Sequence, residues 1–243
     1  MKQNKRYKPF YKQFLRLRSN IQDRPKLFKF KRQKWQNLQR YSKNQLKFYK
    51  RFKTKDQFQL SVSKFASRGN SFQKKFRNNL SERKLFSLFY GGLKKKYLKR
   101  HIIKSMNTKR YNNNVVDFRY KTLQFFESRL DSVLFRSKFC LSFKGAAQLI
   151  LHGHILVNGA PITTKSYILK TNDLIEVAGN IKPRALVGKN LDRSNFWPIP
   201  PKHLSINYRT LQILFLYTDD SNFVPVFNHY LNLSSIVTNI RKY

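Results

Sequence analysis

The sequence is short of cysteine and of long apolar stretches, and each shortage removes a class of protein. Its single cysteine, Cys140, cannot form an internal disulfide or assemble a multi-cysteine zinc site, which indicates a reduced compartment without structural zinc. The longest apolar run covers residues 213–217, far below the roughly 20 residues that cross a bilayer. We therefore expect no transmembrane segment, no membrane partner, no metal and no cofactor.

Acidic residues are also scarce, so the chain is strongly basic. There are 51 Lys and Arg against 11 Asp and Glu, which gives a net charge of +40 over 243 residues. Because a charge of this size repels itself, the chain needs a polyanionic partner, and nucleic acid fits best. The 40% hydrophobic content allows one or two modest cores rather than a single large enzyme core.

Glycine and proline number only 8 each, whereas there are 22 Phe and 13 Tyr. This bias towards residues with AT-rich codons suggests an organellar gene, although an AT-rich nuclear or bacterial genome would give the same pattern. Residues 1–19 are basic and acid-free like a transit peptide, but they lack its serine enrichment and continue into similar sequence. We take them as part of the mature protein.

The positive charge is concentrated in the first half. Residues 1–110 carry 35 basic and 3 acidic residues, and residues 111–243 carry 16 and 8. In residues 1–79, aromatic residues such as Trp35 are interleaved with Lys and Arg, and aliphatic residues are few. High charge favours a solvated, disordered tail, but such a tail has no use for rings. We expect an RNA-binding arm that folds on RNA, stacking rings on bases and pairing lysines with phosphates.

Residues 80–126 form a predicted basic helical region with a glycine corner. Leu85 and Phe89 have helical spacing behind Ser81, a candidate N-cap, and Gly91-Gly92 then interrupts the helix. The next helix is strongly basic and has no acidic neighbours for i, i+4 pairs, which favours a phosphate-facing helix over a merely solvated one. Its expected RNA contacts are Lys94, Lys95, Lys96, Lys99, Arg100 and Lys104.

A compact module is predicted over residues 127–178. Leu130 and Leu134 lie at helical spacing, and a second helix begins behind the candidate N-cap Ser142 and ends at His152-Gly153. Two helices of this kind can set a basic edge against an RNA helix.

Short strands complete this module. Residues 155–157 are apolar, with β-branched residues at both ends, and Asn158-Gly159 is a tight-turn signal. Residues 174–177 form a second predicted strand after the Asn172-Asp173 turn. The predicted fold class is α+β: a basic helical N-terminal region, a module of two helices and a short antiparallel sheet, and a C-terminal β segment.

The module resembles the RNA-binding domain of the ribosomal protein S-four family of the small ribosomal subunit. The Arg-Leu-Asp opening at residues 129–131, the helix end at residues 148–154, the Val157-Asn158-Gly159 turn and the Asn172-Asp173 turn occur in the family's order. Upstream, Tyr90-Gly91 is similar to the corner between two basic helices in this family. The resemblance covers roughly residues 80–243.

This resemblance implies binding to small-subunit ribosomal RNA at a helix junction early in assembly, beside neighbouring ribosomal proteins, with a face near the point where messenger RNA enters. The family usually has Arg at two positions of the second module helix where this chain has Phe143 and Ala147, so those phosphate contacts do not carry over. The contacts expected on the module are Arg129, Arg136, Lys138, Lys144 and His152.

Residues 179–243 are expected to be a β-rich segment that packs on the module. Leu204, Ile206 and Tyr208 alternate as in a strand, and residues 223–227 suggest an edge strand because they include Pro225. The Asn-rich residues 107–117 are expected to be a loop or an insertion.

Catalytic and metal chemistry have weaker signals. His152 and His154 flank a glycine but lack a ligand set with Cys140, and His152 is expected to cap its helix or meet RNA. Asp131 follows Arg-Leu as in some RNA pseudouridine synthases, but a carboxylate in the first turn of a helix is favoured by the helix dipole. Only 65 residues follow the module, which is too few for a catalytic domain.

We therefore expect a non-enzymatic structural constituent of an organellar small ribosomal subunit, in the mitochondrion rather than the plastid, without homo-oligomers. The alternatives are a non-ribosomal RNA-binding or chaperone module and, with less support, an RNA-modifying enzyme.

Overall fold

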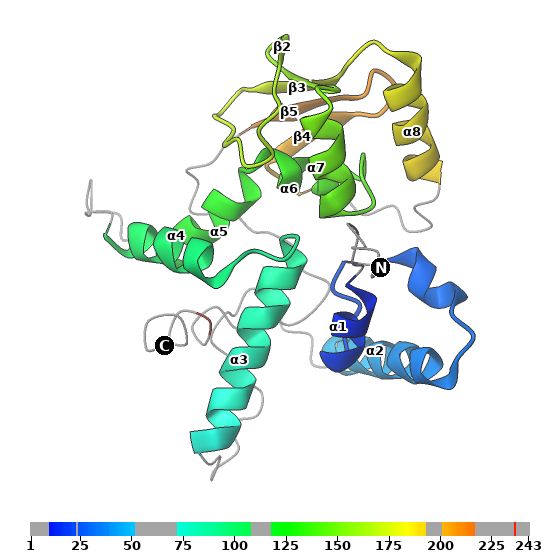
Figure 1. Cartoon of the computed structure of the whole chain (residues 1–243), viewed down its shortest axis with the longest axis vertical. Helices are drawn as coiled ribbons and strands as arrows, with labels where there is room; N and C mark the ends of the chain where they lie inside the picture. Colours follow the sequence, from blue (N-terminus) through cyan, green and yellow to red (C-terminus); the bar gives the residue numbers. More distant parts are fainter. Residues whose placement is uncertain are drawn as a thin grey trace, which may run out of the picture. The chain divides into compact units, whose positions relative to one another are not determined.

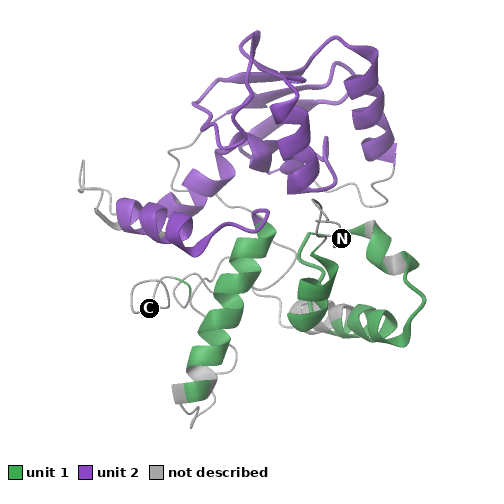
Figure 2. Ribbon diagram, in the orientation of Figure 1, with its two compact units in different colours: residues 1–89, 227–239 green, residues 90–226, 240–243 purple. Residues whose placement is uncertain are grey.

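The structure is a computed structural model that describes residues 10–22, 24–51, 72–107, 118–192, 201–216 and residue 236. It comprises two compact units, residues 1–89 with 227–239 and residues 90–226 with 240–243 (Figure 2). The division between Phe89 and Tyr90 falls inside the predicted helical region 80–126.

The first unit is helical in its described residues (Figure 1). Much of residues 10–51, which belong to the expected arm, is helical. Ser81 is not an N-cap, since its helix begins at Phe72; its hydroxyl instead donates to the Arg77 carbonyl at 2.9 Å. The elements are α1 (Tyr11–Arg16), the 3₁₀ helix η1 (Pro25–Lys29), α2 (Gln33–Arg51) and α3 (Phe72–Phe89).

A glycine corner follows α3, as predicted. Gly91 and Gly92 have φ angles of +78° and +84°, in the left-handed region that favours glycine. Gly91 also has no room for a side chain, because a Cβ there would lie 2.8 Å from the Cβ of Phe143. The corner is therefore specified both by backbone conformation and by packing.

The helices of the second unit begin where local signals place them. Ser142 caps its helix, with its Oγ accepting from the Gly145 N–H at 3.1 Å, and the preceding helix has Asp131 in its first turn. Both module helices are thus confirmed. The helices are α4 (Lys95–Asn107), α5 (Phe118–Glu127), α6 (Leu130–Arg136), α7 (Phe143–Leu151) and α8 (Ile181–Asp192).

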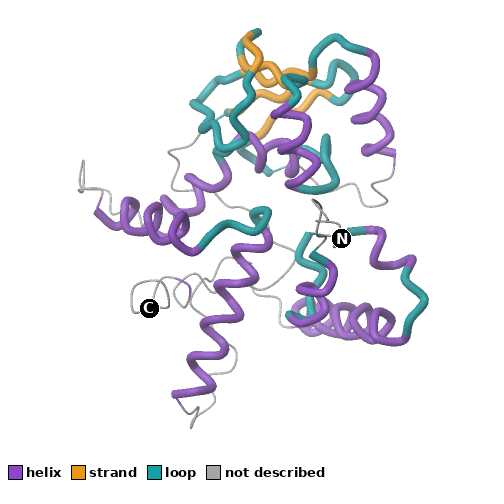
Figure 3. Tube along the Cα trace, viewed as in Figure 1, coloured by secondary structure: helices purple, strands orange, loops and turns teal. Residues whose placement is uncertain are grey.

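One antiparallel sheet, with the order β2-β1-β3-β5-β4, completes the second unit (Figure 3). The predicted Asn158-Gly159 turn is confirmed: both residues have positive φ, and Val157 pairs with Ala160 across it. The Asn158 side chain accepts from the Leu174 N–H at 2.9 Å and so joins this turn to the next strand. The strands are β1 (Ile155–Val157), β2 (Ala160–Pro161), β3 (Leu174–Val177), β4 (Leu204–Asn207) and β5 (Gln212–Phe215).

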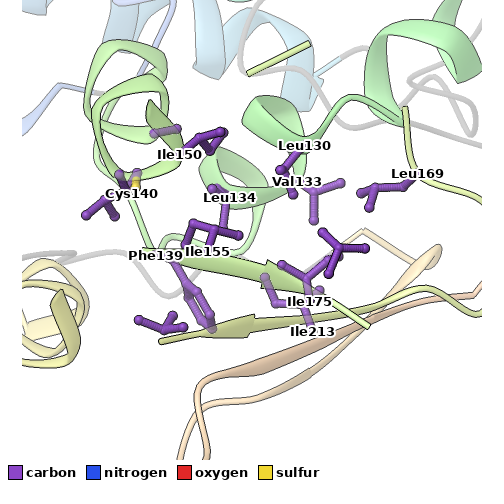
Figure 4. Close-up of a cluster of buried hydrophobic side chains, with 14 of the residues drawn as sticks. Leu130, Val133, Leu134, Phe139, Cys140, Ile150, Ile155, Leu169, Ile175 and Ile213 are labelled. Carbon is purple, nitrogen blue, oxygen red and sulfur yellow. The ribbon is translucent and has the colours of Figure 1, made fainter. Parts of the chain in front are cut away.

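The core of the second unit lies between α6, α7 and one face of this sheet (Figure 4). The apolar residues that set the helical spacing in the sequence point into it, and so do alternate strand residues. Among its members are Leu130, Val133, Leu134, Ala146, Ile150, Ile155, Val157, Ile175 and Ile213. Thus, the module expected from periodicity is the packed centre of this unit.

The segment after the module differs from the expectation. Residues 181–192 are the helix α8, not β structure, and Pro183 and Val187 are buried at i, i+4 spacing. The strand at Leu204–Asn207 is confirmed, whereas β5, which lies between β3 and β4, was not predicted. The expected edge strand at residues 223–227 and nearly all of the loop at 107–117 lie outside the described residues; Asn107 ends α4.

Candidate nucleic-acid interface

The basic helix α4 has one buried face and one cationic face. Leu98 and Ile102 are 1% and 2% exposed and anchor the helix. Its sequence contains no acidic residue, so the opposite face carries only positive charge. Every lysine and arginine predicted there is exposed: Lys94, Lys95, Lys96, Lys99, Arg100 and Lys104. The structure thus gathers all six predicted contacts on one helix and the residue before it.

Side-chain contacts hold α4 against the rest of the second unit. The ring of His101 stacks on Phe125 of α5, with centroids 3.8 Å apart and 18° between the planes. Ser105 and Thr122 share a 2.6 Å hydrogen bond between their hydroxyls. These contacts link α4 to α5 and fix which face of the helix is presented to solvent.

The electrostatics of α4 are visible in His101. Burial lowers the pKa of its imidazole, and the charges of Lys104, Arg129 and Arg100 lower this pKa further. The three cations near this imidazole make the local electrostatic potential more positive. Such a potential attracts phosphate groups.

Arg129 was expected to contact phosphate, and the structure contradicts this. It is 3% exposed, and its guanidinium donates to both carboxylate oxygens of Asp131, at 3.0 and 2.7 Å. A third donor reaches the Tyr97 hydroxyl at 2.7 Å, and the guanidinium lies 5.3 Å from the centroid of that ring. Because Tyr97 is on α4, Arg129 ties the basic helix to the start of α6, and its guanidinium is not presented to solvent.

The side chain of Arg136, which was also expected to contact phosphate, is likewise engaged inside the protein. Its Nε donates to the fully buried carboxylate of Glu127 at 2.9 Å, and a second nitrogen bonds the other oxygen. Tyr90, which is 1% exposed, donates its hydroxyl to the same carboxylate at 2.6 Å. An arginine so engaged in the interior is a structural ion pair between α5 and α6.

The remaining predicted contacts stay on the surface of the module. Lys138, with a φ of +65°, and Lys144, in the first turn of α7, are half-buried, and the Lys138 Nζ lies 5.5 Å from the Phe135 ring centroid. His152 is the C-cap residue of α7, as expected, and its exposed ring stacks on His154. Whether these three side chains touch RNA stays a prediction.

The two residues that depart from the S-four pattern, Phe143 and Ala147, are both at least half-buried in the structure. Phe143 is 4% exposed, with its ring 4.5 Å from that of Phe135 and 6.0 Å from that of Tyr90. Ala147 is half-buried on the same helix. The start of α7 therefore contributes an aromatic contact beside the glycine corner where the family usually has a cation.

Sequence reasoning missed a second set of exposed cations, on α8: Lys182, Arg184 and Lys189. The signal was present, since Pro183, Val187 and Leu191 recur every four residues as on one face of a helix. The alternation at residues 204–208 and 223–227 favours a β-rich segment and gives no indication of the helix before it.

No group of His, Cys, Asp and Glu in the described part of the chain could hold a metal ion. Cys140 is buried, and burial raises the pKa of its thiol to about 12, so it is a poor nucleophile and a poor metal ligand at neutral pH. None of the described helices has both the length and the apolar character needed to cross a membrane.

The fold and the match to known families define this chain as an S4-domain protein: the S4 domain matches residues 128–175. A small ribosomal subunit protein uS4c of Brachypodium pinnatum is 32% identical over 146 residues, which cover 57% of this chain and 71% of the relative. The chain therefore belongs to the uS4 family of small ribosomal subunit proteins. This is the S-four family that the module resembles.

Other relatives match over shorter stretches. The uS4 protein of Aquifex aeolicus (strain VF5) is 31% identical over 121 residues, which are 50% of this chain and 54% of that protein. The uS4c protein of Cycas taitungensis is 41% identical over 85 residues, which are 35% of this chain and 42% of that protein. The chain thus spans about half the length of most of the relatives that it matches.

Proposed function

We propose that this chain is a structural, non-catalytic constituent of an organellar small ribosomal subunit and binds its ribosomal RNA. The observation that carries the proposal is the cationic face of α4, whose exposed Lys and Arg lie on a helix without a single acidic residue. The Arg129 contacts to Tyr97 hold this face on the S4 module. Membership of the uS4 family supports ribosomal RNA as the polyanion.

Binding is tested with the full chain and an in vitro transcript of a small-subunit ribosomal RNA. Each neutralised phosphate contributes about 0.7–0.9 to the slope of log affinity against log salt. A variant that removes three α4 charges should lower this slope by about 2 and weaken binding at every salt concentration: Lys95→Gln, Lys96→Gln and Lys99→Gln.

A matched control removes three exposed lysines from other parts of the same unit: Lys165→Gln, Lys170→Gln and Lys202→Gln. Both variants have the same net charge, so a general charge effect would weaken them equally. Equal losses, or a flat salt response of the wild type, would contradict a site on α4.

Assembly is tested by sedimentation. The tagged chain should remain with the small subunit through a moderate salt wash, at about one copy per particle, as expected of a constituent next to other ribosomal proteins. Free protein after the wash would favour a non-ribosomal RNA-binding role. We also propose a face near the point where messenger RNA enters, and a monomeric free chain, because a charge of +40 opposes self-association.

The mitochondrion is the proposed organelle. Several matching relatives are uS4c, the chloroplast form, which supports an organellar ribosome of either kind. The mitochondrial choice rests on the Phe-rich composition and the long basic arm before the S4 domain. Hybridisation of the gene to purified mitochondrial and plastid DNA distinguishes the two, and a plastid signal alone would reject the choice.

A further inference from the structure

Residues 10–51 contain aromatic rings that were expected to stack on RNA bases, but the structure uses them internally. Trp35 is 9% exposed and its ring lies 4.9 Å from that of Phe30, which in turn meets Tyr11 edge-on at 5.3 Å. Phe14 is 1% exposed. Most of these rings therefore have protein neighbours and are not presented to bases.

Aliphatic residues complete a small core in this segment. Ile21, Leu27 and Leu38 are 0%, 2% and 5% exposed. The side chain of Gln39, on α2, donates to the Leu27 carbonyl at 3.3 Å and joins α2 to η1. The three helical elements α1, η1 and α2 thus share one apolar interior.

A buried glutamine attaches this segment to α3. Gln22 is 4% exposed, and its Nε2 donates to the carbonyls of Leu88, at 2.8 Å, and Phe89, at 3.3 Å. These carbonyls are in the last turn of α3, where no intrahelical donor is available. The segment is therefore joined to a defined point of its own unit.

The outside of the segment is almost purely cationic. Residues 10–51 contain 14 Lys and Arg and one acidic residue, Asp23. The described cations are exposed with the exception of Arg24, which is half-buried; the exposed ones are Lys12, Arg16, Arg18, Lys26, Lys29, Lys31, Arg32, Lys34 and Arg40. Such a surface is costly for a chain without a polyanion and is complementary to a phosphate backbone.

We propose that residues 10–51 form a self-folded subdomain that binds the phosphate backbone of RNA through cations other than those of α4, while Trp35 and its neighbours stay in the subdomain core. The contact is electrostatic and independent of base identity, since the rings are engaged with one another. This proposal rests on the proposed function for the identity of the RNA. It deepens that function by adding a preformed phosphate-binding surface to the one on α4.

The core is tested by fluorescence of Trp35. The chain has one other tryptophan, so a Trp197→Phe variant leaves Trp35 as the sole reporter. In RNA-free protein its emission should be blue-shifted and protected from acrylamide, and both properties should persist when the small-subunit RNA transcript is added. Red-shifted, acrylamide-accessible emission that is quenched by RNA would show base stacking by an unfolded arm and overturn the proposal.

The surface is tested with a charge variant in the Trp197→Phe background: Lys29→Gln, Lys31→Gln and Arg32→Gln. Lys34 is kept because its Nζ lies 5.9 Å from the centroid of the Trp35 ring, and its loss would change the emission directly. The affinity of the charge variant for the transcript should fall about tenfold or more at moderate salt, with a salt slope lower by about 2. The matched control replaces exposed neutral residues of the same segment, Gln13→Ala and Asn37→Ala, and should bind like the parent. Unchanged Trp35 emission shows that each variant is folded.

The outcomes separate this proposal from the proposed function. If only the α4 variant loses affinity, the second surface is rejected and the ribosomal function stands. If the α4 variant binds normally and this one does not, the α4 site is rejected while the subdomain stands. Unchanged RNA binding by the charge variant, together with lost binding to poly-glutamate, would assign the surface to an acidic protein and overturn the proposal.

Discussion

Replacement of Glu127 by glutamine tests whether the buried ion pair is structural. The wild-type carboxylate is 0% exposed and accepts from the Tyr90 hydroxyl and from two nitrogens of Arg136. Glutamine keeps the shape but removes the charge, so the guanidinium of Arg136 is left in the interior without an anion. Breaking a buried pair in this way costs about 3–5 kcal/mol of unfolding free energy.

The pH dependence provides a second readout. Burial alone would raise the pKa of the Glu127 carboxyl, but the charge and hydrogen bonds of Arg136, with smaller contributions from His203 and Tyr90, hold it below its ordinary value of 4.5. A carboxyl with a lowered folded pKa stabilises the fold above the unfolded pKa, and this stability is lost as the pH falls through the folded pKa. The acid-induced loss below about pH 4.5 should therefore be smaller in Glu127→Gln than in the wild type.

The measurement is equilibrium urea unfolding of the full chain, followed by circular dichroism at neutral pH and at several acidic pH values. Glu176→Gln is the matched control, since Glu176 is half-buried on β3 and accepts from the neutral Gln212 side chain. It should cost less than about 1 kcal/mol. The double variant Glu127→Leu with Arg136→Met should recover most of the loss, because a hydrophobic pair of similar volume is often neutral.

Two results would refute this reasoning. One is a loss below about 1 kcal/mol in Glu127→Gln, which would mean that Arg136 finds solvent or another anion. The other is a double variant that is no more stable than Glu127→Gln, which would mean that the loss does not come from an unpaired Arg136. Either would return Arg136 to the set of candidate phosphate contacts.

Three further predictions concern stability. Gly91→Ala should lower the free energy of unfolding by more than about 2 kcal/mol, because the new Cβ would meet Phe143. Gly153→Ala, at a φ of +69° but in open space, should lower it by about 1–2 kcal/mol. Equal losses in urea unfolding would contradict the packing at the corner. Burial lowers the pKa of His203 to about 4, so the free energy of unfolding should fall by up to about 3 kcal/mol as the pH drops from 6.5 towards 4. The variant His203→Phe should lose this pH dependence. A variant with the pH profile of the wild type would show that His203 is not its source. Ser142→Ala should cost about 1 kcal/mol through loss of the α7 cap, and no measurable change would show that water replaces it.

Elements with strong local signals could be predicted from the sequence. The cap at Ser142, the Asn158-Gly159 turn and the Gly91-Gly92 corner each depend on backbone preferences of the residues themselves, and the structure confirms all three. The cationic face of α4 was predictable for a related reason, since a helix with no acidic residue has no local partner for its lysines.

Elements without such signals were missed or misassigned. The strand β5 lies in a continuous apolar run at residues 213–217, where no alternation separates a strand from a buried helix segment. In α8, Pro183 and Val187 have helical spacing, but the strand-like alternation farther along the chain is the stronger signal. The candidate cap at Ser81 failed because the helix continues upstream to Phe72, and Ser81 bonds to its own helix instead.

The sequence by itself determined the family, because the order of the module's short motifs does not depend on how the chain packs. Its charge likewise indicated a polyanionic partner without reference to the fold. Only the tertiary structure decided which cations are exposed and which are paired in the interior. Arg136 and Glu127 are nine residues apart, and their pairing requires α5 and α6 to be packed together. Likewise, Trp35 is a core residue because the chain before α2 folds back on it, with the Phe30 ring 4.9 Å from its own. Burial depends on which elements pack around a residue. The composition of the chain and the spacing of its residues therefore cannot reveal whether a charge or a ring already has a partner inside the protein.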